Sequence, residues 1–201
     1  IMSSDWSSDV CSSDLDQDIC SSSTQLNAND PGNNSATWST TSNTAVVENE
    51  SDPNSSADEL STGEHIFTWT VSNSHCSASD NVKITNNGVI ANAGPDISTC
   101  SSLATLDAER PVTGRGTWTS KNSDVQINNN AYIKTKVSNL GRGENIFVWE
   151  VVNENCTTSD EVIVTNNSFT VDAGPDQMIC QETTRLQAQA LRCYCRSGSL
   201  P

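Results

Sequence analysis

The chain has 201 residues, a formal net charge of −15 and only ten lysines and arginines. This acidic excess argues against nucleic acid as a partner, because neutralising phosphates requires a basic face, and against docking on anionic lipid. No stretch approaches the roughly 18 apolar residues of a membrane-spanning helix, so we expect no membrane insertion.

The first residues do not fit the pattern of the rest. Residues 5–15, DWSSDVCSSDL, resemble one translated frame of a common short-read sequencing adapter. Scars of this kind are excluded from reasoning about a fold. We therefore predict that 1–15 is an artefact without ordered structure; the alternative is a disordered leader rich in serine and aspartate.

From Asp16 onward the chain repeats itself every 80 residues. When 16–95 is aligned with 96–175 without a gap, 28 of 80 positions are identical. Self-similarity at a fixed period indicates an array of like modules. The predicted organisation is repeat 1 at 16–92, shortened at its start, repeat 2 at 93–172, the start of a truncated repeat 3 at 173–190, and an off-register tail at 191–201.

Short runs of alternating apolar residues predict the strands. In chain order, the first repeat has them at Leu26 and Ala28, at Thr37–Ser39 as a central strand, at 66–72, and at Val82 and Ile84, and the second repeat has the same runs 80 residues later. Repeat 2 adds 132–137, whose counterpart in repeat 1 is expected to be short. Alternation with β-branched and aromatic residues indicates half-buried strands, and no window has a helical period.

Six or seven short strands in 80 residues are typical of an immunoglobulin-type sandwich. The predicted fold is therefore all-β, a tandem array of immunoglobulin-like β-sandwiches with an 80-residue period. The alternation places six aromatic side chains in the two cores, namely Trp38, Phe67, Trp69, Trp118, Phe147 and Trp149.

Each repeat has one cysteine before its first core strand and one after the strand that carries Phe-x-Trp-x-Val. We predict the disulfides Cys20–Cys76 and Cys100–Cys156. Closing a loop of about 57 residues would contribute roughly 4 kcal/mol by the chain-entropy estimate. Matched cysteine pairs in a small domain indicate an extracellular location; the alternative is free buried thiols in a cytosolic protein. Zinc fits less well, because two cysteines per repeat fall short of four ligands.

The ordered motif series carries a resemblance. AGPD-x3-C, L-x-A, a Trp, G-E-x-I-F-x-W-x-V-x-N-x2-C and S-D-x-V resemble the Ig-like, PKD-like tandem repeats of large bacterial secreted surface proteins, including gliding and adhesion proteins. The resemblance covers 16–190. GRGTW at 114–118 matches the family's glycine-rich first tryptophan, whereas NNSATW at 33–38 departs from it. The resemblance implies an extracellular stalk, spacer or adhesin whose partners are adjacent repeats, and it offers no catalytic residues.

Several carboxylates gather where one repeat meets the next. Carboxylate oxygens could hold Ca²⁺ there and stiffen the junction; the alternative is solvated carboxylates that cap turns. No other cofactor is expected. The calcium candidates are Asp80, Asp96, Asp160, Asp172 and Asp176.

The sequence offers no recurring catalytic set. His65 and His75 are the only histidines, and they align with Asn145 and Asn155. A Ser-His-Asp set built on His75 and Asp80 is expected by chance among so many serines, since triads are recognised by geometry. The leading hypothesis is a non-catalytic spacer or adhesive segment, and the alternative is a module that binds a surface glycan or protein. An exposed tryptophan platform would favour the alternative.

Overall fold

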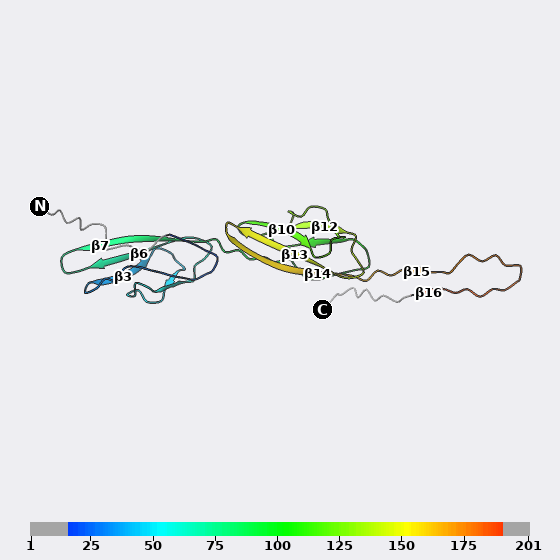
Figure 1. Cartoon of the computed structure of the whole chain (residues 1–201), viewed down its shortest axis with the longest axis horizontal. Coiled ribbons are helices and arrows are strands. Elements are labelled where there is room, and N and C mark those ends of the chain that lie inside the picture. Colours follow the sequence, from blue (N-terminus) through cyan, green and yellow to red (C-terminus); the bar gives the residue numbers. More distant parts are fainter. Residues whose placement is uncertain (1–15, 191–201) are drawn as a thin grey trace. The chain divides into compact units, whose positions relative to one another are not determined.

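The computed structural model describes residues 16–190, with side chains as far as residue 188. The predictions made for 1–15 and 191–201 lie outside these residues. Every regular element in the described part is a β-strand (Figure 1). Two compact units divide the chain: the first runs as far as Val89 and includes Val152–Thr157, and the second comprises Ile90–Val151 and the residues from Thr158 onward.

The first unit is a sandwich of two sheets. A four-stranded sheet has the order β1-β7-β6-β3 and a three-stranded sheet the order β2-β5-β4. All neighbours are antiparallel except β1, which runs parallel to β7. The strands are β1 (Gln17–Ile19), β2 (Thr24–Gln25), β3 (Ser35–Thr40), β4 (Val46–Val47), β5 (Ser56–Asp58), β6 (Gly63–Ser72) and β7 (Ser77–Asn86).

The second unit has the same strand order. Its sheets are β8-β14-β13-β10, again with a parallel β8–β14 pair, and β9-β12-β11. A short antiparallel pair, β15 and β16, follows. The strands are β8 (Ile97–Thr99), β9 (Ala104–Asp107), β10 (Arg115–Ser120), β11 (Gln126–Ile127), β12 (Lys134–Ser138), β13 (Gly143–Asn153), β14 (Cys156–Asn166), β15 (Val171–Asp172) and β16 (Gln189–Ala190). This is an immunoglobulin-like, all-β fold, as predicted.

The alternation of the sequence becomes the burial pattern of the long strands. Along β6, Phe67, Trp69 and Val71 are buried, whereas Ile66 on the opposite face is 46% exposed. Successive side chains of a strand point to opposite faces, so the apolar set forms one side of the sandwich core. All six aromatic residues placed in the core by the sequence are at most 1% exposed. The predicted short counterpart of 132–137 is β5, with three residues.

A pair of tryptophans forms the centre of each core. Trp38 on β3 lies opposite Trp69 on β6, with ring centroids 5.0 Å apart and planes tilted by 43°. Trp118 and Trp149 repeat this arrangement at 5.0 Å and 45°. Tilted aromatic pairs at this separation are favourable beyond the area they bury. The strand of Trp38 was predicted to be central, but β3 lies at the edge of its sheet.

The four indole N–H groups differ in whether they have a hydrogen-bond partner. Trp38 donates to Asp52 O at 3.1 Å and Trp118 to Ile133 O at 3.4 Å, whereas those of Trp69 and Trp149 are buried with no hydrogen-bond partner among the described residues. Burying about 150–250 Å² of indole contributes roughly 4–6 kcal/mol as an upper bound. An unpaired buried donor costs about 1–3 kcal/mol. Packing therefore outweighs the unpaired donor at both positions.

Candidate functional site

The carboxylates of the junction hold backbone amides. In the second unit, Asp160 Oδ2 accepts a hydrogen bond from Ala93 N at 2.8 Å, and Asp96 Oδ1 accepts one from Ile163 N at 2.9 Å. These two bonds tie both ends of the AGPD turn to β14. The first unit has one counterpart among its described residues, where Asp16 Oδ1 accepts from Lys83 N at 3.0 Å. Bonds from a backbone N–H to a charged acceptor are among the stronger hydrogen bonds of proteins.

The glycine of AGPD is required by its backbone. Gly94 has φ +82°, and a Cβ there would lie 2.6 Å from Asp107 O. Gly174 repeats both features, with φ +82° and 2.6 Å to Gln187 O. Positive φ and close backbone approach both favour glycine. The motif is therefore a turn packed tightly onto the following strand region.

The other calcium candidates are also engaged locally. Asp172 Oδ1 accepts from Gly174 N at 2.8 Å, Asp80 Oδ1 accepts from Asn81 N at 2.9 Å, and Asp176 lies exposed in the third AGPD segment. Within residues 16–190, no three His, Cys, Asp or Glu side chains lie close enough together to hold a metal ion. The structure thus does not bring the five calcium candidates together into a cation site.

The cysteine pairing differs from the prediction. Cys20 is bonded to Cys156, with a Cα–Cα distance of 5.4 Å and a sequence separation of 136, while Cys76 is free and exposed. Cys100 is also disulfide-bonded, but not to Cys156. The predicted pairs Cys20–Cys76 and Cys100–Cys156 are therefore wrong. Cys156 belongs to repeat 2 by sequence, but it lies in the first compact unit.

Strand register explains the correction. Ile19 pairs with Asn86 at the far end of β7, whereas Cys76 directly precedes Ser77 at its start. Nine residues of strand span about 30 Å, far beyond the roughly 7 Å between Cα atoms that a disulfide can bridge. In the second unit, Thr99 likewise pairs with Asn166, and Cys156 begins the same strand. Neither repeat can close its own predicted bridge.

His65 is the one buried histidine of the described chain, with 5% exposure. Its Nε2 lies 2.8 Å from Ser61 O and its Nδ1 lies 3.0 Å from Ser42 Oγ. A carbonyl oxygen only accepts, so Nε2 carries a proton, and in the neutral imidazole Nδ1 accepts from the Ser42 hydroxyl. Ser42 Oγ in turn accepts from Ala45 N at 3.2 Å, as in a turn cap. The pair resembles a Ser-His dyad, but a backbone carbonyl stands where a triad has its acid.

The dyad lines an open hollow of about 440 Å³ formed by residues 41–44, Ser61 and 64–66. The rim combines hydroxyl and amide groups with Glu64 and the half-exposed Ile66. His75, the other histidine, is exposed at the β6–β7 turn, where its Nδ1 lies 2.6 Å from Ser74 Oγ. A hollow with a few polar groups and one apolar side chain can hold a small polar ligand.

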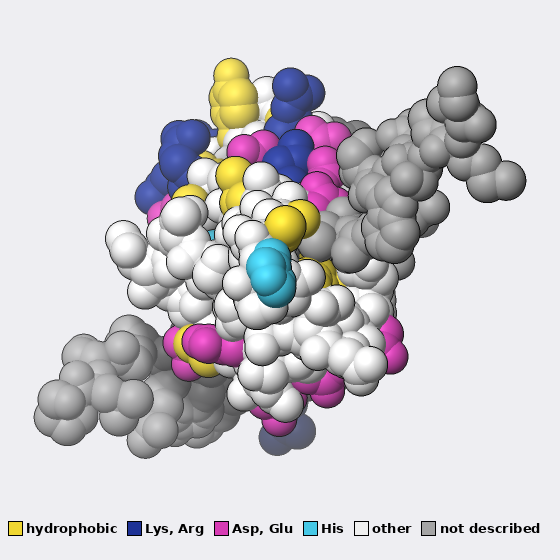
Figure 2. Space-filling view, turned by 90° about the vertical axis from the view of Figure 1, so that its left-hand side faces the viewer, with side chains coloured by type: hydrophobic (Ala, Val, Ile, Leu, Met, Phe, Trp, Pro, Cys, Tyr) yellow, Lys and Arg dark blue, Asp and Glu magenta, His cyan; other side chains and the backbone are white. Residues whose placement is uncertain are grey.

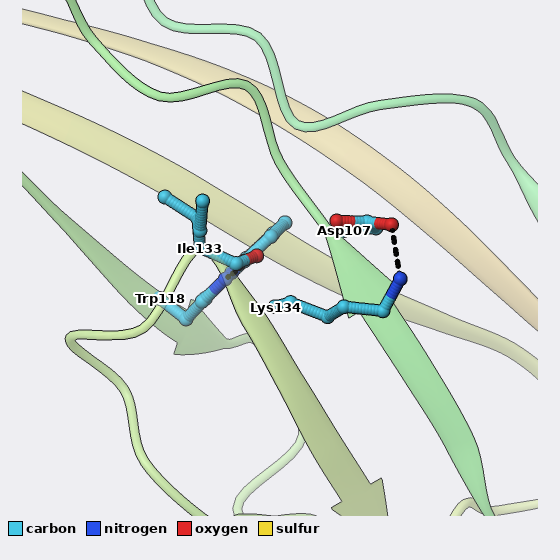
Figure 3. A network of polar contacts seen from close by, with 4 residues as sticks. All are labelled: Asp107, Trp118, Ile133 and Lys134. Carbon is cyan, nitrogen blue, oxygen red and sulfur yellow. Dashed lines mark hydrogen bonds and ion pairs between the residues drawn. The ribbon is translucent and has the colours of Figure 1, made fainter.

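No repeat tryptophan forms an exposed platform. Figure 3 shows Trp118 against the backbone of Ile133, next to the Lys134–Asp107 ion pair at 2.8 Å. Lys134 and Asp107 are more than half exposed, and such surface pairs contribute about 0–1 kcal/mol. The environment of Trp118 is therefore structural.

Asn86-Asn87 recurs as Asn166-Asn167 one period later, and none of the site predictions includes these residues. Asn86 Nδ2 donates to Leu60 O at 2.8 Å, and Asn166 Nδ2 donates to Leu140 O at 3.0 Å. Both asparagines are buried at the end of the last strand. They fix the loop before the long hairpin to that strand. Their exact 80-residue recurrence was the available signal.

No family model and no curated protein sequence matches the chain. Solved structures do. The insect immune protein hemolin aligns with 78% of this chain and 46% of its own, at 9% identity and a TM-score of 0.51. Extracellular domains 3–5 of Drosophila OTK align with 78% of this chain and 61% of that one, at 10% identity and 0.40. An endo-fucoidan hydrolase of glycoside hydrolase family 107 aligns with 78% of this chain and 27% of its own, at 16% identity and a TM-score of 0.31.

The chain thus spans less than two thirds of each of these structures. At these identities the similarity to hemolin shows the fold alone, which is that of immunoglobulin-like domains in tandem. Among the described residues, none forms a helix with the length and apolar character needed to cross a bilayer.

Proposed function

We propose that this chain is a non-catalytic, extracellular repeat region that acts as a structural spacer, stalk or adhesive segment of a large secreted bacterial surface protein. The observation that carries the proposal is how the recurring polar groups are used. Asp16, Asp96 and Asp160 cap backbone amides, and Asn86 and Asn166 cap loop carbonyls. Groups that recur in the repeats thus maintain the fold.

Two further features support the same proposal. A disulfide between described cysteines fits an oxidising compartment outside the cytoplasm. The four core tryptophans are buried, so they offer no stacking surface for a sugar. The motif resemblance to tandem repeats of bacterial surface proteins supports the source and the setting.

The test is to display the full chain on a cell surface between an anchor and a small reporter binding domain. A spacer should present the reporter as well as an unrelated tandem immunoglobulin pair of equal length does, and the chain alone should bind no component of glycan and protein arrays. Deleting the chain should reduce reporter access. Saturable binding to one array component, or turnover of a glycan, would contradict the spacer role.

The hollow beside His65 favours a second candidate, a module that binds a surface glycan or protein. Its polar rim and the exposed Ile66 provide hydrogen bonds and an apolar contact. Glu64→Gln and Ile66→Thr change the rim and leave the buried His65 in place. If the displayed chain binds an array component and both variants weaken that binding at unchanged melting temperature, the binding module replaces the spacer as the function.

A further inference from the structure

We propose that disulfides in this repeat class connect successive repeats: the first cysteine of one repeat bonds the hairpin cysteine of the next. Under this rule, Cys76 is the docking point for the first cysteine of a preceding copy of the repeat. The inference concerns how repeats are joined covalently. It goes beyond the proposed spacer role and does not depend on it.

Cys20–Cys156 is the observed example of the rule. Cys20 corresponds to Cys100 in the repeat alignment, and Cys156 corresponds to Cys76. The bond therefore joins the first-cysteine position of repeat 1 to the hairpin position of repeat 2. The equal registers of β1 on β7 and of β8 on β14 keep the two positions of one repeat about 30 Å apart, so a bridge within a repeat is excluded.

A second contact accompanies the bond. Asn153 Nδ2 donates to Asn87 O at 3.0 Å, and the Cys156 sulfur lies 3.5 Å from Ile19 O. The hairpin turn thus meets the end of β1 and the residue after β7 through an asparagine and a cysteine three positions apart. Cys156 is only 3% exposed as a result.

The β6–β7 turn also has an asparagine and a cysteine three positions apart, Asn73 and Cys76, but here the cysteine is exposed. Its sequence is NSHC at 73–76, where the second repeat has NENC. Asn73 Oδ1 accepts from Cys76 N at 3.0 Å and Asn73 N donates to Cys76 O at 2.9 Å, so the turn is already ordered. Cys76 is exposed and carries a free thiol. The turn is therefore a preformed counterpart of the bonded hairpin.

The surface around this turn suits a copy of the same acidic chain. Figure 2 views the molecule from the end at which β6 turns into β7, and the middle of this view shows mostly uncharged side chains and backbone around one histidine. The segment that follows each first cysteine is also uncharged, Ser21-Ser22 and Ser101-Ser102. Two neutral surfaces can meet without the like-charge repulsion that a chain of net charge −15 otherwise creates.

Bond formation needs an oxidant. With oxidised glutathione, the two cysteine thiols become one disulfide and the glutathione disulfide is reduced to two glutathione thiols, so that protons and electrons balance. The Cys76 thiolate attacks glutathione disulfide and releases one glutathione thiolate. The thiolate of the first cysteine of the preceding repeat then attacks the mixed disulfide at the Cys76 sulfur and releases the second glutathione thiolate. An exposed thiol such as Cys76 is accessible to this exchange.

The test adds a copy of residues 16–95 directly before Asp16 of the full chain. In the copy, asparagine replaces the histidine that corresponds to His75, as repeat 2 has at Asn155, so that the two hairpin peptides differ in mass. After oxidation in glutathione buffer, the chain is alkylated, digested without reduction and analysed by mass spectrometry. We expect a peptide that links the first cysteine of the added copy to Cys76, loss of Cys76 alkylation, and retention of Cys20–Cys156. In the control, serine replaces the first cysteine of the added copy, and Cys76 should be alkylated again.

A bridge inside the added copy, or a Cys76 that is alkylated equally in both chains, would overturn the proposal. The unaltered full chain gives an independent result, whether or not the extended chain folds. Trypsin alone leaves Cys20 and Cys76 in one peptide, because Lys83 is the first Lys or Arg of the chain; trypsin with a glutamate-specific protease separates them. A Cys20–Cys76 link would refute the rule, whereas a Cys20–Cys156 link supports it. Array binding, which tests the proposed function, is unaffected by either result.

Discussion

His65 and Asn145 brace the same loop in the two units with different side chains. His65 Nε2 lies 2.8 Å from Ser61 O, and Asn145 Nδ2 lies 2.9 Å from Gly141 O, each bond reaching back four residues. Both residues are buried on the strand that carries the core tryptophan. The imidazole is therefore a replacement for a structural carboxamide.

This equivalence predicts that His65→Asn keeps most of the stability of the first unit. The carboxamide can donate to the same carbonyl, so we expect a loss below about 1 kcal/mol in the free energy of unfolding. His65→Ala removes the donor and leaves a cavity, which should cost about 2–3 kcal/mol. Urea unfolding of the full chain measures both. Equal losses in the two variants would show that the hydrogen bond contributes nothing.

Glu59 and Asn139 occupy another pair of equivalent positions, with φ of +55° and +59°. Asparagine tolerates this left-handed region better than glutamate does. Glu59→Asn should therefore stabilise the first unit by about 0.5–1 kcal/mol, or raise its melting temperature by roughly 2–8 °C. Glu50→Asn is the matched control, because repeat 2 also has asparagine there, at Asn130, and Glu50 has no positive φ. A rise in the control as large as that in Glu59→Asn would contradict the backbone explanation.

The strands and their cores were predictable because local alternation determines which side chains share a face. Phe67, Trp69 and Val71 needed no long-range information. The cysteine pairing did need it. Which sulfurs meet depends on the parallel register of β1 against the end of β7, and nothing local to Cys20 encodes that register. The order of cysteines along the chain therefore led to the wrong partners.

The acidic residues show a similar limit. Carboxylates near each AGPD motif can be found in the sequence. A sequence does not distinguish an aspartate that binds Ca²⁺ from one that caps a backbone amide, because the residue type is the same. Only the distances from Asp96 and Asp160 to backbone nitrogens distinguish the two roles.

Those distances predict how the junction responds to mutation and to calcium. Asp96→Ala removes the acceptor for Ile163 N and should lower stability by about 1–2 kcal/mol, whereas Asp124→Ala, at an exposed turn, should change it by less than about 0.5 kcal/mol. Millimolar Ca²⁺ should leave the melting midpoint of the unaltered chain unchanged. A calcium-dependent rise that disappears in Asp96→Ala would instead establish a cation site.

Gly94 gives a stricter test of the AGPD turn. Gly94→Ala requires alanine at φ +82° and places Cβ 2.6 Å from Asp107 O, so we expect a loss of about 2–4 kcal/mol. Gly141→Ala is the matched control: its nearest neighbours would be 3.6 Å away, and repeat 1 has Ser61 at this position. The control should be neutral within about 0.5 kcal/mol. Similar melting temperatures for both variants would mean that the turn relaxes easily.

Pulling the chain from its two ends should reveal the Cys20–Cys156 bond directly. The segment between the bonded cysteines, whose sequence separation is 136, cannot extend while the disulfide is intact, because force passes from one sulfur to the other. At about 3.3–3.6 Å per residue, the reduced chain should yield roughly 45–50 nm more contour length than the oxidised chain. Without reductant, Cys20→Ser should extend further than the unaltered oxidised chain, because the Cys20–Cys156 bond is lost while the bond of Cys100 remains. Cys76→Ser should behave as the unaltered chain does, since its thiol is free. If Cys76→Ser also lengthened the oxidised chain, Cys76 would have to carry part of the load through a bond of its own.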